Sequence, residues 1–210
     1  RKDVGMMIRT FCTIFKGVPK DKQPGLILKT SSAGFSVMER ERLTKKLKGV
    51  LDPYGDKCPS VHLVFGDLTQ EEMNSLYNDE KVKAMLMFTK GEGYGRPLAE
   101  FATTGKPIIV SDWSGHKDFL PEKYTHYLEG ELTEVHQSAQ NKFLIQGSKW
   151  FTVNYSSAAS VINQVFTRYH EACKKSERLQ HNIRKNFSMN NMTENLDKIL
   201  SSYIRVPEKV

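Results

Sequence analysis

The chain has few of the residues that metal clusters and disulfide frameworks require. Its 210 residues include only three cysteines, Cys12, Cys58 and Cys173, which lie far apart and form no pair at metal-ligand spacing. An odd, scattered set of this kind is typical of reduced thiols in a cytoplasmic protein. The six histidines show no ligand spacing such as H-E-x-x-H. We therefore expect no metal ion and no cofactor.

Long apolar runs are also missing. No uncharged apolar run approaches the length of a membrane-spanning helix, and no secretory signal is visible at the start. Hydrophobic residues make up 39% of the chain and charged residues 26%, which is ordinary for a soluble globular protein. The length suffices for one substantial core. We expect a single domain over residues 1–210, with a helical tail over about 156–205.

Strand and helix patterns alternate along the first half of the chain. Short apolar runs predict strands at 25–30, 61–66, 83–88 and 107–111. Helical periodicity predicts helices at 3–16, 36–48, 69–77 and 97–104. Two of these helices begin with the capping-box patterns Ser36-x-x-Glu39 and Thr69-x-x-Glu72. The repeated βα pattern predicts an α/β, Rossmann-like parallel sheet with helices on both faces.

The second half is less regular. A strand is expected within 124–132 and an irregular insertion over 137–147. Helical periodicity returns at residue 156, and further helices are expected near 174–186 and 192–203.

The most informative stretch is Glu-Gly-Tyr-Gly-Arg-Pro-Leu-Ala-Glu at 92–100. Its glycines and proline follow an apolar run, which predicts a strand end, a tight loop and a helix start. Backbone N–H groups at such a junction attract anions, and the carboxylates of Glu92 and Glu100 can accept hydrogen bonds from sugar hydroxyls. Phosphate and hydroxyls together indicate a nucleotide-sugar. A simple turn is the alternative, because the glycine spacing does not match the dinucleotide G-x-G-x-x-G fingerprint.

The stretch resembles the E-x7-E motif of retaining glycosyltransferases with the GT-B fold, in particular glycosyltransferase family 4. Flanking segments also resemble that family: the strand, loop and helix at 61–77, the strand at 105–111, and the start at Arg1–Val4 followed by Phe11. The last of these resembles the segment in which a phosphate-binding lysine opens the first helix. The resemblance is good over residues 1 to about 120, weak to about 150, and faint along the tail.

The resemblance implies a C-terminal donor-binding domain that binds a nucleotide-diphosphate sugar for metal-independent transfer with retention. Glu92, the catalytic residue, would bind a donor-sugar hydroxyl, and Glu100 the ribose hydroxyls. The N–H groups of Gly93, Tyr94, Gly95 and Arg96, together with Lys2, would hold the diphosphate. In the family an arginine usually precedes this lysine by a few residues, so Arg1 need not be that arginine.

Further candidate residues lie at the same edge of the predicted sheet. Lys29 ends a strand there and faces either phosphate or solvent. Gly66 and Leu68 belong to a loop that the resemblance places near the nucleobase, with a plain turn as the alternative. Trp113 either packs under the donor sugar or covers the domain edge, and His116 is interpreted as a loop histidine rather than a base.

Partners follow from the same resemblance. GT-B enzymes bind the acceptor with a separate N-terminal domain, which is not recognisable here, so we expect a fragment that binds donor weakly and does not turn over alone. The acceptor, whether glycan, lipid-linked or protein, is not readable, and peripheral membrane contact is a further option.

The net charge of +7 and the basic tail favour a noncatalytic nucleic-acid module as one alternative. A solvated helix face explains that tail better, so no nucleic acid is expected. A nucleotide-sugar epimerase or a glycogen-phosphorylase-like enzyme would need other catalytic groups.

Overall fold

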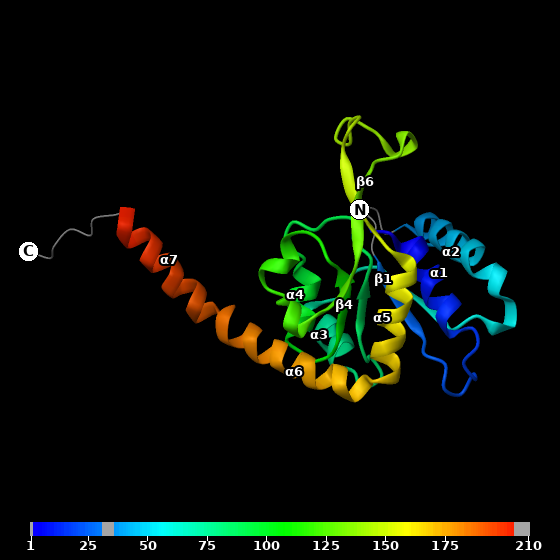
Figure 1. Ribbon diagram of the computed structural model, residues 1–210, viewed down its shortest axis with the longest axis horizontal. Helices are drawn as coiled ribbons and strands as arrows, with labels where there is room; N and C mark the ends of the chain where they lie inside the picture. The colour runs from blue at the N-terminus through cyan, green and yellow to red at the C-terminus, as the bar shows by residue number, and fades with distance from the viewer. Residues whose placement is uncertain (1, 31–35, 204–210) are drawn as a thin grey trace, which may run out of the picture.

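The computed structural model describes residues 2–30 and 36–203, so Arg1 lies outside the described residues. It is an α/β structure (Figure 1). The helices are α1 (Val4–Phe15), α2 (Val37–Leu51), α3 (Gln70–Asn78), α4 (Arg96–Ala102), α5 (Tyr155–Thr167), α6 (Tyr169–Asn186) and α7 (Met189–Tyr203). The strands are β1 (Leu26–Thr30), β2 (Val61–Phe65), β3 (Met85–Met87), β4 (Ile108–Ser111), β5 (His126–Leu128), β6 (Gly130–Glu134) and β7 (Lys149–Val153).

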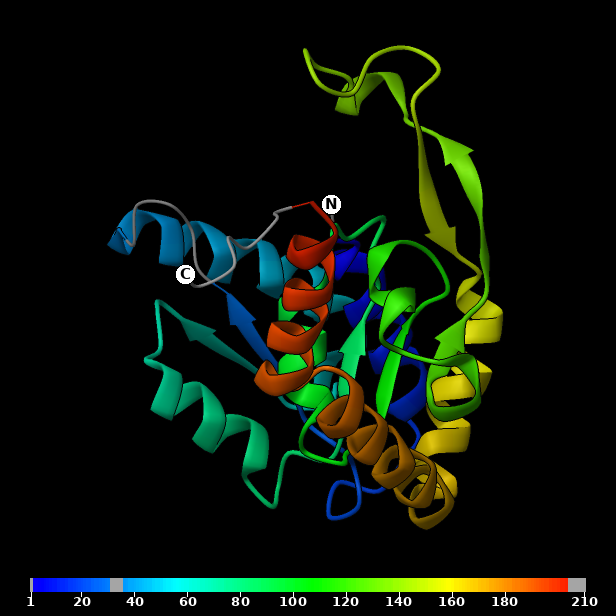
Figure 2. The same cartoon turned by 90° about the vertical axis from the view of Figure 1, so that its left-hand side faces the viewer.

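The predicted parallel pairing is confirmed in both halves of the sheet region. Strand β1 pairs with β2 in parallel, with Leu26 opposite Val61. Strands β3, β4 and β5 form a second parallel sheet in that order, with Ile109 opposite His126. The remaining pair, β6 and β7, is an antiparallel hairpin that extends away from the rest of the molecule (Figures 1 and 2).

Side chains that alternate along β4 separate two hydrophobic cores. Ile109 belongs to the core that α1 and α5 cover, which Leu26 of β1 also enters. Its neighbours Ile108 and Val110 belong to the core that α4 and α6 cover. Because successive strand side chains point to opposite faces, this division shows helices on both faces of the sheet, as predicted.

The helix starts follow the sequence closely. Ser36 and Thr69 cap α2 and α3, and each forms the full capping box with the glutamate three residues later. Helix α1 buries Ile8, Phe11 and Cys12, whereas Val4 is exposed. The reason is its position at the first helical residue, where the chain has only just left the sheet edge.

Two predictions about elements were wrong in extent, and one strand was not predicted. Strand β3 covers only Met85–Met87 and is half-buried, not the fully buried run expected over 83–88. Helix α6 begins at Tyr169, earlier than the expected 174, and β7 was not predicted. The expected strand within 124–132 is present as β5 and the start of β6. Within the described ranges, no helix has both the length and the apolar character needed to cross a membrane.

Candidate functional site

The segment that precedes α1 docks against the carboxyl end of β3. The Asp3 N–H donates to the Phe88 carbonyl at 2.8 Å, and Lys2 forms an isolated antiparallel bridge with Thr89. The Asp3 carboxylate accepts a hydrogen bond from the Tyr155 hydroxyl at 2.9 Å. These contacts fix the direction in which the Lys2 side chain leaves the backbone.

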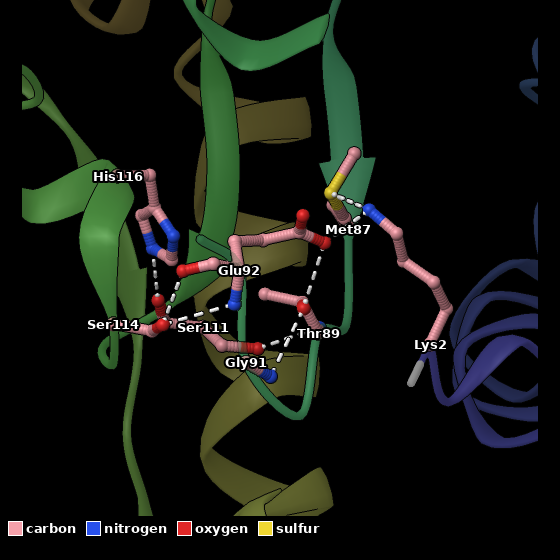
Figure 3. A network of polar contacts seen from close by, with 8 residues as sticks. All are labelled: Lys2, Met87, Thr89, Gly91, Glu92, Ser111, Ser114 and His116. Atoms are coloured by element: carbon pink, nitrogen blue, oxygen red, sulfur yellow. Dashed lines mark hydrogen bonds and ion pairs between the residues drawn. The ribbon is translucent and has the colours of Figure 1, made fainter. Parts of the chain in front are cut away.

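Lys2 and Glu92 meet at this edge (Figure 3). The Lys2 ammonium forms an ion pair with Glu92 Oε1 and also donates to Met87 Sδ at 3.0 Å. The Thr89 hydroxyl donates to the same Glu92 oxygen at 3.0 Å. The Glu92 side chain is 5% exposed and that of Lys2 33%. The structure therefore holds a buried carboxylate beside a cation that solvent can reach, at the carboxyl edge of the sheet, which is the edge where open α/β folds bind ligands.

A second loop clamps Glu92 from the carboxyl end of β4. The Ser114 hydroxyl accepts from the Glu92 N–H at 2.9 Å and donates to the Glu92 carbonyl. The Gly115 N–H donates to that carbonyl at 3.0 Å. The Ser111 hydroxyl accepts from the Thr89 N–H at 2.9 Å. Two loops that are about twenty residues apart in sequence thus behave as one unit.

The clamp requires unusual backbone geometry. Ser114 has φ 96° and ψ −172°, a region that is almost reserved for glycine and costs roughly 1–3 kcal/mol. A Cβ atom on Gly115 would lie 1.9 Å from the Gly93 carbonyl oxygen. Gly95 has φ 91°, as the predicted glycine loop requires. The clamp was not predicted from the sequence, where its one local signal is the Ser-Gly pair after β4.

His116 lies in the loop after β4, as the second residue of a short 3₁₀ turn (Gly115–Asp118), and it is fully buried. Its Nε2 lies 2.8 Å from the Ser111 carbonyl, so Nε2 carries the proton and donates. Burial lowers the pKa of His116, and the Ser111 carbonyl and the Glu92 charge oppose this only in part. The imidazole is therefore neutral and acts as a spacer beneath the Glu92 loop.

Glu100 lies on α4, whose N-cap is Gly95. The helix starts at Arg96, so Glu100 is its fifth residue and lies just beyond the predicted first turn. Its carboxylate accepts from Arg96 Nε at 2.6 Å, and the side chains are 75% exposed for Arg96 and 40% exposed for Glu100, so the pair adds little stability. Burial, followed by the Glu100 charge, raises the pKa of Tyr77 to about 12. The structure gives Glu92 and Glu100 separate partners, the first buried and the second facing solvent.

The remaining predicted residues form separate contacts. Lys29 Nζ donates to the Gly66 carbonyl at 2.7 Å, so the ends of β1 and β2 are joined, and Leu68 is half-buried beyond them. Tyr94 is half-exposed and its ring packs on Phe119, with centroids 4.7 Å apart. Three paired contacts therefore account for six of the predicted residues: Lys2 with Glu92, Arg96 with Glu100, and Lys29 with Gly66.

The β6–β7 hairpin borders the site on one side. The Phe151 N–H donates to the Lys90 carbonyl at 3.2 Å, and the Lys90 ammonium lies 4.2 Å from the centre of the Trp150 ring. Trp113 stacks on Phe151 with ring centroids 6.4 Å apart, as expected for a side chain that covers the domain edge. Because β7 was not predicted, sequence analysis did not place Lys90 or Trp150 here.

In residues 2–30 and 36–203, no three histidine, cysteine, aspartate or glutamate side chains are grouped so that they could hold a metal ion. The absence of a metal from the reaction stays a prediction.

Comparison with known proteins identifies the fold. No protein-family model and no curated protein sequence matches the chain. Among solved structures, Anabaena HepE in complex with UDP and glucose superimposes with a TM-score of 0.61 and 13% identity, over 92% of this chain and 44% of HepE. Sucrose-phosphate synthase from Thermosynechococcus elongatus gives 0.61 and 15% identity, over 95% of this chain and 43% of the synthase.

A third likeness is the UDP-forming α,α-trehalose-phosphate synthase from Burkholderia xenovorans, solved with glucose-6-phosphate. It gives a TM-score of 0.65 at 8% identity, over 95% of this chain and 41% of the synthase. The chain thus spans less than half the length of each of these proteins. At such identities the likeness shows the fold alone, which is the Rossmann-like α/β fold, with helices on both faces, of GT-B glycosyltransferases.

Proposed function

We propose that the chain is the donor-binding domain of a retaining glycosyltransferase of family 4 type, and that it binds a nucleotide-diphosphate sugar. One observation carries the proposal: the Lys2 ammonium, the Glu92 carboxylate and the Thr89 hydroxyl converge at the carboxyl end of β3. The Lys2 ammonium can bind the negative charge of a diphosphate, and the Glu92 carboxylate can accept a hydrogen bond from a sugar hydroxyl. The fold supports it, because HepE has been solved with UDP-glucose.

Without a ligand, Lys2 neutralises Glu92. On donor binding, the Lys2 ammonium forms an ion pair with the diphosphate in place of Glu92, and a hydroxyl of the donor sugar donates a hydrogen bond to Glu92. Thr89 and the Ser114 clamp keep the carboxylate in place while its partner changes. The cation then stabilises negative charge that develops on the leaving diphosphate, which is electrostatic catalysis without a metal ion.

Glu100 binds the ribose of the donor nucleotide. Its half-exposed carboxylate accepts hydrogen bonds from the ribose hydroxyls, and this releases the Arg96 guanidinium toward the diphosphate. The N–H groups of the Gly93–Arg96 loop complete the diphosphate site. Acceptor binding belongs to a separate domain, so the chain by itself binds donor without turning it over. The protein acts in the cytoplasm.

Calorimetric titration with a panel of UDP-, GDP- and ADP-sugars tests the proposal. We expect one member of the panel to bind. Replacing Lys2 or Glu100 with alanine should weaken that binding roughly 10- to 100-fold, because each change removes a charged hydrogen-bond partner. Polynucleotide binding, the property of the alternative function, should not change.

Glu194→Ala is the matched control, since that glutamate is exposed on α7. It should leave donor binding unchanged. A folded sample that binds no member of the panel overturns the proposal, as does a Glu100→Ala variant with unaltered affinity for the best donor.

A further inference from the structure

Two of the three cysteines meet in the structure, although 46 positions separate them. Cys12 lies on α1, and Cys58 follows the 3₁₀ helix η1 (Asp52–Lys57). Their Sγ atoms are 3.9 Å apart. Cys12 is fully buried and Cys58 is half-buried, so only Cys58 has direct access to solvent. The sequence predicted unpaired thiols.

The backbone on both sides of Cys58 is held against α1. The Tyr54 hydroxyl donates to the Arg9 carbonyl at 3.0 Å, which fixes the start of η1. Gln23 Nε2 lies 2.8 Å from the Phe15 carbonyl and 3.2 Å from the Lys57 carbonyl, so it bridges the end of α1 to the residue before Cys58. The closeness of the two sulfur atoms is therefore a consequence of several independent hydrogen bonds.

We propose that Cys12 and Cys58 form a site of reversible oxidative modification, at which hydrogen peroxide closes an intramolecular disulfide. The sulfur atoms of a disulfide are about 2.0 Å apart, so the two must approach by a further ~1.9 Å. Rotation of the two side chains about their Cα–Cβ bonds supplies this approach while the hydrogen bonds to Tyr54 and Gln23 stay in place.

The chemistry starts at Cys58, the sulfur that solvent can reach. Peroxide transfers one oxygen to it, giving Cys58 sulfenic acid and one water. The Cys12 sulfur then attacks the Cys58 sulfur, its proton joins the departing hydroxide, and a second water leaves as the disulfide forms. The two thiols lose two electrons and two protons together, and peroxide is reduced to water. Burial raises the pKa of Cys12 to about 12, in keeping with its role as the second thiol to react.

The disulfide would tie the middle of α1 to the segment that leads into β2. Closing a loop of this length restricts the unfolded chain, so the oxidised protein should melt several degrees higher than the reduced protein. The proposal does not depend on the proposed function, because neither sulfur touches the Lys2–Glu92 cluster.

The experiment counts thiols in the whole chain before and after mild treatment with peroxide. After unfolding and alkylation, we expect three reactive thiols in the reduced protein and one in the oxidised protein. Peptide mapping should find the peptides containing Cys12 and Cys58 linked to each other, and dithiothreitol should restore three thiols. Three thiols after oxidation, or a link to Cys173 or to a second chain, would overturn the proposal.

Two variants sharpen the test. Cys58→Ser should keep its two thiols through the same treatment and lose the rise in melting temperature. Cys173→Ser is the matched control, because Cys173 is also half-buried but lies on α6. It should fall from two thiols to none. If a variant does not fold, the peptide map of the peroxide-treated chain without substitutions still shows whether Cys12 and Cys58 are linked.

Discussion

Gly115 is the residue at which the fold and the candidate site depend on each other most directly. Its N–H donates to the Glu92 carbonyl, and a Cβ atom there would lie 1.9 Å from the Gly93 carbonyl oxygen. Gly115→Ala must therefore push the two loops apart. We expect the free energy of unfolding to fall by about 2–4 kcal/mol, as for other overpacked sites, and donor affinity to fall with it. Urea unfolding measures the first effect and calorimetry the second.

Gly49→Ala is the comparison for this variant. Gly49 lies inside α2, where no atom would contact the added methyl group. We expect this change to raise the free energy of unfolding by about 0.5–1 kcal/mol, because alanine favours a helix interior. Equal stability of the Gly115→Ala variant and the unchanged protein would mean that the two loops are not packed as described.

His126 makes stability depend on pH. Burial, followed by the charge of Lys175, lowers the pKa of His126 to about 4, whereas an unfolded histidine titrates near 6.5. Between these values the unfolded chain binds a proton that the folded chain does not, so stability falls as pH falls. From pH 7 to pH 5 we expect a loss of about 1–2 kcal/mol from this residue. The lowered pKa of His116 acts in the same direction.

Unfolding at a series of pH values tests this expectation. His126→Leu should flatten the pH dependence, since the buried His126 Nε2 has no hydrogen-bond partner in the described structure that the change would strand. His170→Gln, at an exposed histidine on α6, should keep the full slope. A His126→Leu variant with the original slope would show that other groups cause the acid sensitivity.

At the scale of elements, sequence patterns predicted the position of a helix or strand wherever neighbouring residues alone determine it. Apolar runs and capping boxes predicted β1, β2, β4, α2 and α3 to within a few residues, because alternation and caps are properties of neighbouring residues. Strand β7 was not predicted, although its Trp150, Phe151, Thr152 and Val153 favour a strand and Gly147, at positive φ, marks a turn before it. The run is only five residues long and follows an irregular loop, and its partner β6 confirms it as a strand.

The candidate site likewise combines features that the sequence predicted with contacts that it could not predict. The motif 92–100 predicted the glycine loop and the two carboxylates, and the resemblance placed Lys2 near them. The clamp formed by Ser114 and Gly115 could not be predicted, because its contacts with Glu92 come from a segment 22 residues away. Lys2 and Glu92 are 90 positions apart, and no spacing rule reaches across that distance. Their contact depends on how the first segment docks on β3.

At the scale of the whole molecule, charge is distributed unevenly. Residues 1–58 contain thirteen of the thirty-one basic residues but only six of the twenty-four acidic ones. From residue 59 onward the two kinds are equal in number, eighteen each. Within that part, residues 59–155 are net acidic, with nine basic and thirteen acidic residues, whereas the helical tail over 156–205 has eight basic and four acidic residues. The positive charge is therefore divided between the tail and the first segment, which forms α1, β1, α2 and η1 and has the larger excess.

Helix α7 stands apart from both cores. It projects from the molecule in Figure 1, and none of its residues is buried. Its exposed apolar side chains include Met189, Met192, Leu196, Ile199 and Leu200. We expect truncation after Ser188 to change the melting temperature by less than about 2 °C, because neither core loses a member. Calorimetry of the shortened chain measures this.

The contrasting truncation ends one helix earlier, after Arg168. It removes α6 and with it Leu179 and Ile183, which are buried in the core that α4 also covers. Losing two such aliphatic side chains costs several kcal/mol, a large part of the stability of a domain of this size, so this shorter chain should unfold. If truncation after Ser188 were equally damaging, α7 would have to pack against the body of the molecule in solution. Its apolar face would then contribute to the fold instead of being exposed.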